Sequence, residues 1–450
     1  MKNQDEGLKK EIGVFGLVAN MTNIIIGSGI FILPAIVAGI LGPASIVAYI
    51  FCGVLVTSIM LCYAEAGSKI SQSGGDYTYN VIAFGKFAGF QIFMIGFFST
   101  ICGIAAITNA LINTLSEIVP FFQNEIVRVV FILLIFLGLT FINIRGIKQG
   151  IGLVKILTVA KILPITILII TGIFFIHPAN LKWVSVPGFN DIGAASLILF
   201  FAYTGGEGGL QVGGEIKKPE RTVPKAILIT VGFVVLFYIL VQIVVSGVLG
   251  NALDPKSATP LVHTAQIVLG SFGFTLLFAG AAISMFGSVS GNVLNLPRCV
   301  FAISRDNILP IPSLKKIHSK YATPHISIIV TIILSCAFTL AGGFQTLAVF
   351  SVAGVLLIYL SLSFVVLKFR KMETMKNKGF TIPGGALVPI LSMIITLVFL
   401  SQLAGKELIS ILIFMGISSV LYLFIHLIRT NQQKGAKEKN KKTFPASTDL

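Results

Sequence analysis

Long apolar segments alternate with short polar loops along almost the whole chain. Each segment has the length of a membrane-spanning helix, because about 20 residues cross the hydrocarbon core of a bilayer. The pattern therefore predicts an all-α polytopic membrane protein with about twelve transmembrane helices. The predicted spans are residues 13–38, 42–67, 84–114, 126–144, 152–176, 191–214, 224–250, 266–296, 325–341, 346–367, 386–404 and 408–428.

Two of these spans carry glycine-rich interruptions at their centres. The first span contains Gly27, Ser28 and Gly29, and the sixth contains the stretch TGGEGG around Glu207. Since each glycine costs a helix about 1 kcal/mol relative to alanine, we predict that helices 1 and 6 are discontinuous. The breaks occupy matching places in two sets of five spans. Because each set has an odd number of spans, the two sets have opposite orientations in the membrane. This pattern predicts a 5+5 inverted repeat and points to the central site of a transporter.

The predicted organisation has five parts. A cytoplasmic N-terminal tail at 1–12 precedes the first repeat, which covers 13–176, and the second repeat covers 191–367. Two C-terminal helices at 386–428 lie outside the repeat, and a basic cytoplasmic tail at 429–450 follows them. No polar stretch between the spans is long enough to form a separate soluble domain.

An unwound segment turns backbone groups into ligands. The N–H groups that begin a half-helix lie at the positive end of its dipole and suit a carboxylate, whereas the C=O groups that end a half-helix suit an ammonium. Together they match both charges of an α-amino acid without any charged side chain. The alternative, that these glycines only allow close packing of neighbouring helices, stays open at each break.

The net charge of +16 does not indicate nucleic-acid binding, because of where the basic residues lie. With the N-terminus in the cytoplasm, nearly all of them fall in cytoplasmic loops and tails; those on the outer side are Arg128, Lys182, Lys256 and Lys406. The positive-inside rule then predicts a multi-pass protein of the cytoplasmic (inner) membrane with both termini in the cytoplasm. The lipid bilayer is its expected partner, and the sequence does not give the oligomeric state.

The chain shows no residue pattern that is typical of an enzyme or a metalloprotein. Its five cysteines lie in or near the apolar spans and read as small buried hydrophobes, and its five histidines are dispersed. We find no phosphate-binding loop, no catalytic triad and no paired carboxylates. We therefore predict no metal, no cofactor and no enzymatic activity.

Four stretches carry a resemblance to a known family. They are GSGIF at 27–31, SGGDYTYNVIAFG at 73–85, EIKKPERTVPKAI at 215–227 and RCVFAISRDNILP at 298–310. In this order and at these distances they resemble signatures of the amino acid–polyamine–organocation (APC) transporters. The resemblance covers nearly the whole chain and implies the leucine-transporter-type fold of that family.

The resemblance also implies which residues bind substrate. It places the substrate carboxylate at the amides of the first break, and the ammonium at carbonyls just before that break and in the sixth span. Phe201 resembles the aromatic lid of the family, and counting along span 8 places Asn292 at the cavity. The candidate substrate-binding residues are Ile24, Ile25, Ile26, Gly27, Ser28, Gly29, Phe201, Tyr203, Thr204, Gly205, Glu207 and Asn292.

Two ionisable residues within spans are further candidates, because charges in a bilayer are costly and usually functional. Glu207 has three open roles: to bind a cationic side chain, to carry a proton, or to hold the unwound segment. Lys161 lies about 14 Å into span 5, and the resemblance places its ammonium against the first break and a hydroxyl of span 8. Ser288 is the first candidate for that hydroxyl, with Ser284 and Ser290 as substitutes.

In this arrangement Lys161 either takes the place of a sodium ion as a brace or carries a proton during the cycle, so Lys161 and Ser288 are the candidate proton-coupling residues. The predicted function is secondary active transport by alternating access, with proton-coupled uptake of neutral amino acids. One alternative is an antiporter or exchanger for cationic amino acids or polyamines. An alternative of another class is an amino acid sensor that does not transport.

Overall fold

The computed structural model describes residues 7–183, 186–255, 257, 259–342, 344–376, 378–402 and 409–427. These residues are predominantly helical, and their β-structure is limited to one isolated bridge between Ile12 and Ile216. The predicted basic tail at 429–450 and the first six residues of the predicted N-terminal tail lie outside the described residues.

Thirteen α-helices are labelled in the described part of the chain, and a further helix, Ile409–Leu427, follows them. The bounds of the labelled helices are α1 Val14–Ile25, α2 Gly29–Leu41, α3 Ser45–Lys69, α4 Asp76–Phe84, α5 Lys86–Ile118, α6 Glu125–Ile144, α7 Ile147–Gly172, α8 Phe189–Tyr203, α9 Pro219–Leu249, α10 Pro260–Arg305, α11 His325–Ala341, α12 Phe344–Lys371 and α13 Leu387–Ser401.

Eight helical segments in the described residues are long and apolar enough to cross a membrane, and one of them joins α2 and α3. Four shorter apolar helices, α1, α8, α11 and α13, fall in the remaining predicted spans. The helical class of the prediction is therefore confirmed, whereas the count of twelve crossings and the inverted repeat stay predictions. Several predicted boundaries are shifted, among them the start of α7 at Ile147 and that of α9 at Pro219. In α10, Gly270 has a φ of 63°, and the helix after it runs on to Arg305, beyond the predicted end at 296.

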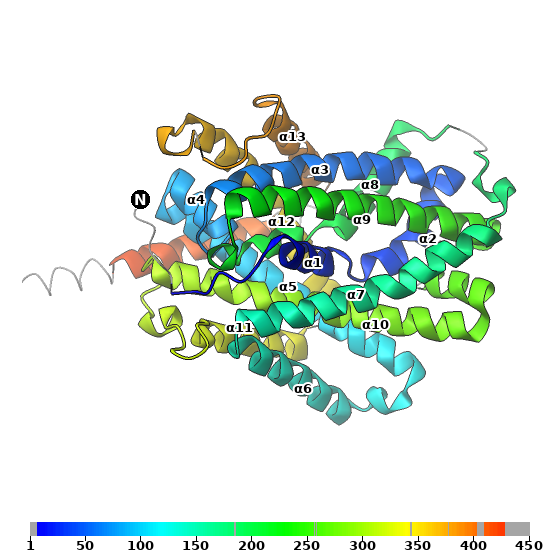
Figure 1. Ribbon diagram of the computed structural model, residues 1–450, viewed down its shortest axis with the longest axis horizontal. Coiled ribbons are helices and arrows are strands. Elements are labelled where there is room, and N and C mark those ends of the chain that lie inside the picture. Colours follow the sequence, from blue (N-terminus) through cyan, green and yellow to red (C-terminus); the bar gives the residue numbers. More distant parts are fainter. Residues whose placement is uncertain are drawn as a thin grey trace, which may run out of the picture.

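The two discontinuous segments lie in the interior of the bundle. The short helix α1 packs against α7, α9 and α10, while α8 packs against α2 and α3. Figure 1 shows α1 at the centre of the molecule, with α6 and α13 on opposite flanks. On the other side of the interior, α5 packs against α10, α11 and α12.

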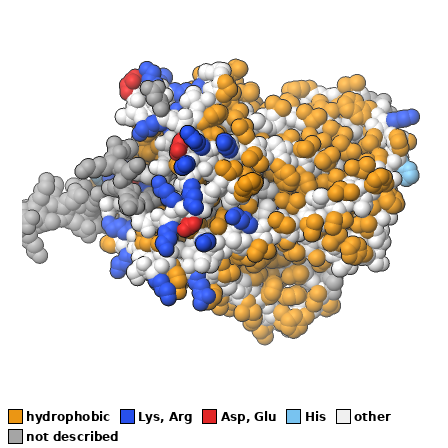
Figure 2. Space-filling model, in the orientation of Figure 1, with side chains coloured by type: hydrophobic (Ala, Val, Ile, Leu, Met, Phe, Trp, Pro, Cys, Tyr) orange, Lys and Arg blue, Asp and Glu red, His pale blue; other side chains and the backbone are white. Residues whose placement is uncertain are grey.

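The surface divides into an apolar flank and a charged end. In Figure 2 most lysine and arginine side chains gather towards the left end of the molecule, and apolar side chains cover most of the rest of this face. Exposed apolar residues such as Leu134, Leu137 and Phe174 suit contact with lipid.

The charged end also contains a fully buried ion pair. Arg298 on α10 donates from Nε and Nη2 to the carboxylate of Glu215, at 2.9 and 3.1 Å, and both side chains are inaccessible to solvent. The carbonyl oxygen of Glu215 accepts from the backbone N–H groups of Glu11 and Ile12, each at 3.0 Å. The N-terminal segment, the end of the sixth predicted span and α10 are therefore joined at this point.

Candidate functional site

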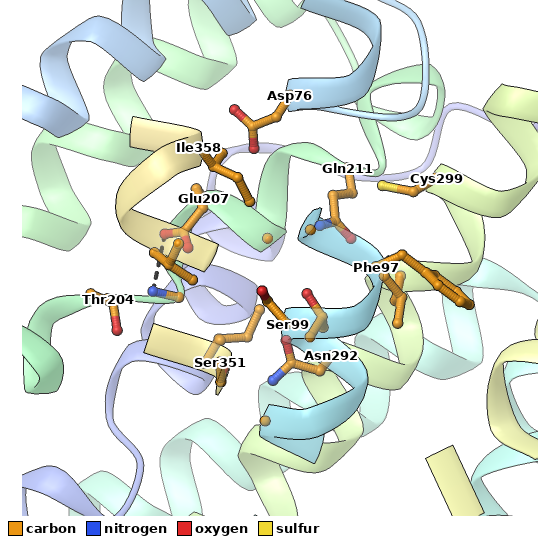
Figure 3. Close-up of a pocket in the computed structure, with 18 of the residues that line it drawn as sticks. Asp76, Phe97, Ser99, Thr204, Glu207, Gln211, Asn292, Cys299, Ser351 and Ile358 are labelled. Atoms are coloured by element: carbon orange, nitrogen blue, oxygen red, sulfur yellow. Dashed lines mark hydrogen bonds between the residues drawn. The ribbon is translucent and has the colours of Figure 1, made fainter. Parts of the chain in front are cut away.

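A cavity of about 150 Å³ lies between the two discontinuous segments. Its wall comes from the α1–α2 junction, the start of α4, the middle of α5, the end of α8 with the turn that follows, α10 and α12. The α5 side of the wall is mainly apolar, whereas the α10 and α12 sides add polar groups; the labelled residues in Figure 3 include Phe97, Ser99, Asn292, Ser351 and Ile358.

The first break lies where the sequence predicts it. Helix α1 ends at Ile25 and α2 begins at Gly29, so the chain between them is non-helical. The N–H of Gly27 donates to the carbonyl of Ile25 at 2.9 Å in a tight turn. The predicted residues that line the cavity here are Ile24, Ile25, Gly27, Ser28 and Gly29. Ile26 is not among them, because its carbonyl turns towards Lys161.

The second break follows Tyr203. Gly205 has a φ of 102°, in the left-handed region that glycine adopts without strain, and a short 3₁₀ turn, η5 Gly206–Leu210, follows it. Of the predicted substrate-binding residues of this span, Thr204, Gly205 and Glu207 line the cavity. Tyr203 does not line it, since its ring packs on Tyr238 with the ring centroids 4.9 Å apart. The side chain of Phe201, the predicted lid, lies outside the described part of the structure.

The two breaks approach each other closely. A Cβ on Gly29 would lie 2.9 Å from the Cβ of Ala202, and one on Gly205 would lie 2.8 Å from a methyl group of Ile24. The hydroxyl of Tyr238 on α9 lies within hydrogen-bond distance of the carbonyl of Ile25, at 3.3 Å, and of Ala202, at 3.0 Å. The absence of a side chain at Gly29 and Gly205 therefore lets the two breaks approach closely, and Tyr238 links the end of α1 to the end of α8.

This arrangement places helix ends of opposite polarity at one cavity. The N-terminus of α2 begins at Gly29 and presents the positive end of a helix dipole, whereas α1 and α8 end beside it with carbonyl groups. A zwitterion with a carboxylate and an ammonium a few ångströms apart fits such a pair of poles. The backbone supplies this complementarity, so it leaves the side chains of the cavity free to select the rest of a ligand.

Glu207 is held by two donors. Its Oε2 accepts from the hydroxyl of Tyr359 on α12 at 2.7 Å and from the N–H of Gly205 at 3.0 Å. The second bond crosses the break itself, which supports the role of Glu207 in holding the unwound segment. Glu207 also lines the cavity, so the other two predicted roles remain open (Figure 3).

Lys161 is fully buried beneath the first break. Its ammonium donates to the carbonyls of Asn23, Ile26 and Ser284, at 2.8, 2.7 and 2.9 Å. Three acceptors match the three donors of an ammonium. The cation thus joins α7 to the end of α1 and to α10, and no carboxylate among the described residues pairs with it.

Two serines of α10 contact the same carbonyl groups. Ser288 donates to the carbonyl of Asn23 at 3.1 Å, and Ser284 donates to that of Ile26 at 2.9 Å. Of the two, Ser284 contacts Lys161 directly, through its backbone carbonyl instead of its hydroxyl. Ser288 therefore lies at the first break, as the sequence suggests. The residue of α10 that contacts Lys161 is Ser284 and not Ser288.

Asn292 lines the cavity one turn beyond Ser288 and donates to the carbonyl of Ser288 at 3.0 Å. The neighbouring Asn295 turns away from the cavity and forms a buried pair with Asn20, in which each amide donates to the other at 2.9 and 3.3 Å.

Three further residues of this site escape the sequence reasoning. They are Asp76, at the first position of α4, Tyr238 and Tyr359. Asp76 lies in the stretch SGGDYTY, which resembles a family signature, and that stretch was the available signal for it. No pattern near Tyr238 or Tyr359 separates them from other aromatic residues of apolar helices.

Comparisons with known proteins agree with this architecture. A family model described as amino acid permease matches residues 12–428. The serine/threonine exchanger SteT of Bacillus subtilis is 31% identical, over 87% of this chain and 91% of that protein. The methylthioribose transporter and the branched-chain amino acid permease BcaP of the same organism are 26% and 24% identical, over 94% and 93% of this chain and the same shares of those proteins.

Proposed function

The chain belongs to the amino acid permease family, and we propose that it is a secondary transporter that moves neutral amino acids across the cell membrane by alternating access. The observation that carries the proposal is the pair of breaks at one cavity, where α2 begins and α1 and α8 end. Its relatives include a serine/threonine exchanger and a branched-chain amino acid permease, which supports an amino acid as the ligand.

In this proposal the substrate carboxylate binds at Gly27, Ser28 and Gly29, while its ammonium binds at carbonyls of Ile24 and Ile25 and of the second break. The apolar part of the wall receives the side chain. It includes Ile92 and Phe97 on α5 and Ile358 on α12, and these residues favour a neutral side chain.

Lys161 has the geometry of a brace. Its ammonium lies at the turn of the first break. Its three acceptors are carbonyls of α1, of Ile26 just after α1, and of α10, so it supports the unwound segment as a bound cation would. The other predicted role, proton transfer by Lys161 with Ser288 nearby, remains part of the proposal, and the variants described below separate the two.

The proposed topology has twelve membrane crossings, two inverted repeats of five helices and both termini in the cytoplasm. The one-sided distribution of basic side chains supports this orientation (Figure 2). Tagging each terminus and testing its access to a membrane-impermeant protease in inside-out vesicles measures the orientation directly.

Two observations favour further candidate functions. The presence of an exchanger among the relatives favours obligatory exchange over proton-coupled uptake. The carboxylates of Asp76 and Glu207 at the cavity favour a cationic amino acid or a polyamine as substrate. Both candidates keep the same binding site. The first differs from the main proposal in what crosses with, or against, the substrate, and the second differs in the substrate itself.

Counterflow in proteoliposomes tests the proposed function. Vesicles are loaded with each of the twenty amino acids, or with agmatine or putrescine, and entry of a labelled trace is followed. We expect acceleration by a subset of neutral amino acids. Acceleration by lysine, arginine or agmatine alone would identify a transporter for cations, and acceleration by none of these compounds would contradict amino acid transport.

A further inference from the structure

Two carboxylates share one end of the cavity. Asp76 comes from the start of α4 and Glu207 from the turn after α8, and Figure 3 shows both above Ser99, Ser351 and Asn292 in that view. Among the described residues that line the cavity these are the acidic ones, and no lysine, arginine or histidine lines it. The negative charge of this end therefore has no fixed cation.

The groups that face Asp76 come from several elements. Those that interact electrostatically with Asp76 are Tyr63 on α3, Glu207, Tyr79 on α4, Cys299 on α10 and Tyr359 on α12. The neighbouring helix α5 contributes apolar residues such as Phe93 to this part of the wall.

The nearby arginines of α10 are engaged elsewhere. Arg298 binds Glu215 in the buried pair described above, and Arg305 binds Asp306 at 2.8 Å. Neither arginine forms an ion pair with Asp76 or Glu207 in the described structure.

The two carboxylates differ in the hydrogen bonds that they accept. Glu207 accepts from the hydroxyl of Tyr359 and the N–H of Gly205, and both bonds stabilise its anion. Asp76 is about nine-tenths buried, and its Oδ1 has no hydrogen-bond partner in the described structure, nor has the hydroxyl of Tyr63. Of the two carboxylates, Asp76 is therefore the one with a buried oxygen that lacks a donor, although the nearby hydroxyl of Tyr63 favours its anion.

The electrostatic effect has a definite sign. Helix α4 lies outside the candidate membrane spans, and burial together with the charge of Glu207 raises the pKa of Asp76 to about 8. The position at the start of α4 favours the anion, but burial outweighs it. Asp76 is consequently neutral at pH 7 and becomes an anion as the pH rises through 8.

We propose that Asp76 is a proton-binding site of the central cavity, and that its proton is carried inward with a neutral amino acid. The inference rests on the proposed transport function. With the proton in place, Asp76 adds no negative charge beside the substrate, and the cavity accepts a zwitterion. Without it, the carboxylate of Asp76 repels the carboxylate of the substrate. Loss of the proton to the cytoplasm then favours release of the substrate there.

The test measures counterflow of labelled L-serine and L-leucine in proteoliposomes between pH 7 and pH 9, with equal pH on both sides. For the unmodified protein we expect the rate at low substrate concentration to fall roughly ten-fold over this range, as a single group with a pKa of about 8 requires. In Asp76→Asn, which mimics the protonated acid, counterflow persists and becomes flat in pH, while an inward proton gradient no longer drives accumulation. Asp76→Glu restores the pH dependence.

Two variants serve as controls. Asp191→Asn changes an exposed carboxylate in the first turn of α8 and keeps the pH profile of the unmodified protein. Lys161→Ala separates the two roles of the lysine: a brace lowers the rate at every pH and keeps the ten-fold fall, whereas a flat profile in this variant would assign the pH dependence to Lys161 and overturn the inference.

Three further results would overturn the inference. The first is a flat pH profile in the unmodified protein, a result that does not depend on the folding of any variant. The second is an unaltered ten-fold fall in Asp76→Asn, and the third is stimulation by L-lysine or agmatine alone, which would mean that the carboxylates bind a cationic side chain. Absence of counterflow with every amino acid contradicts the transport function itself and removes the inference with it.

Discussion

The ammonium of Lys161 lies 2.7 Å from the carbonyl oxygen of Ile26, the residue at which α1 gives way to the first break. A carbonyl that leaves a helix inside a membrane needs a new donor, because no water is available there. Lys161 supplies it, and the hydroxyl of Ser284 supplies a second at 2.9 Å. The break is therefore stabilised by α7 and α10.

Lys161→Ala removes this cation and leaves buried carbonyls of Asn23 and Ile26 with fewer donors. We expect the free energy of unfolding to fall by roughly 2–3 kcal/mol, and transport to fall with it. Thermal unfolding of the purified protein in detergent measures the loss. Lys155→Ala, six residues earlier on the same helix and exposed, should change stability by less than about 0.5 kcal/mol; equal losses in both variants would argue against the brace.

Gly205→Ala places a side chain where none fits. The φ of 102° disfavours any Cβ, and that Cβ would lie 2.8 Å from a methyl group of Ile24. The strain is about 1–2 kcal/mol before any steric overlap, so we expect counterflow to fall at least about ten-fold. Gly232→Ala, on α9 with no atom within 4 Å of the added carbon, is the matched control. Comparable rates in the two variants would contradict the geometry given to the second break.

Tyr359→Phe removes the hydroxyl that donates to Glu207 at 2.7 Å. A hydrogen bond to a charged group contributes about 1.5–3 kcal/mol. We therefore expect the half-saturating substrate concentration to rise by roughly ten-fold, because the segment around Glu207 becomes less ordered. Tyr422→Phe, which removes a hydroxyl on the last described helix, should leave this concentration unchanged. An unaltered value in Tyr359→Phe would mean that Glu207 does not need this donor.

The buried pair of Arg298 and Glu215 predicts a strong and asymmetric effect on stability. Arg298→Met leaves the carboxylate of Glu215 buried without its partner, and we expect a loss of about 3–5 kcal/mol. Replacing both residues with methionine should recover part of it. As a control, Lys376→Met breaks the exposed pair with Glu373, which should cost less than about 1 kcal/mol. Unfolding in detergent compares the four proteins.

The positions of the helix breaks could be predicted from the sequence because they are local. Gly27 and Gly29 lie within three residues, and four glycines surround Glu207, so a short stretch of sequence is enough to predict each break. The general place of Lys161 follows for a related reason, since a charge deep in an apolar span must meet polar partners and the break is the nearest source of free carbonyls.

The side chains around the breaks depend on packing between distant helices. Tyr238 contacts both breaks from α9, Tyr359 reaches Glu207 from α12, and the short helix α4 brings Asp76 to the cavity. The sequence neighbourhoods of the two tyrosines do not distinguish them from other aromatic residues, and the stretch SGGDYTY marks Asp76 without showing what it contacts. The same limit explains Ser284 and Ser288: they lie about one turn apart on α10, so counting along the helix leaves both as candidates.

If the amino acid binds between the two breaks, it protects a cysteine placed at the first break from chemical modification. In a background without the native cysteines, because Cys299 lines the cavity, Ser28→Cys is exposed to a small thiol reagent at increasing amino acid concentrations. We expect the substrate found by counterflow to slow the reaction, with the half-saturating concentration measured for transport, while Ser401→Cys on the exposed end of α13 reacts at a constant rate. A reaction at Ser28→Cys that ignores a saturating substrate would contradict binding between the two breaks.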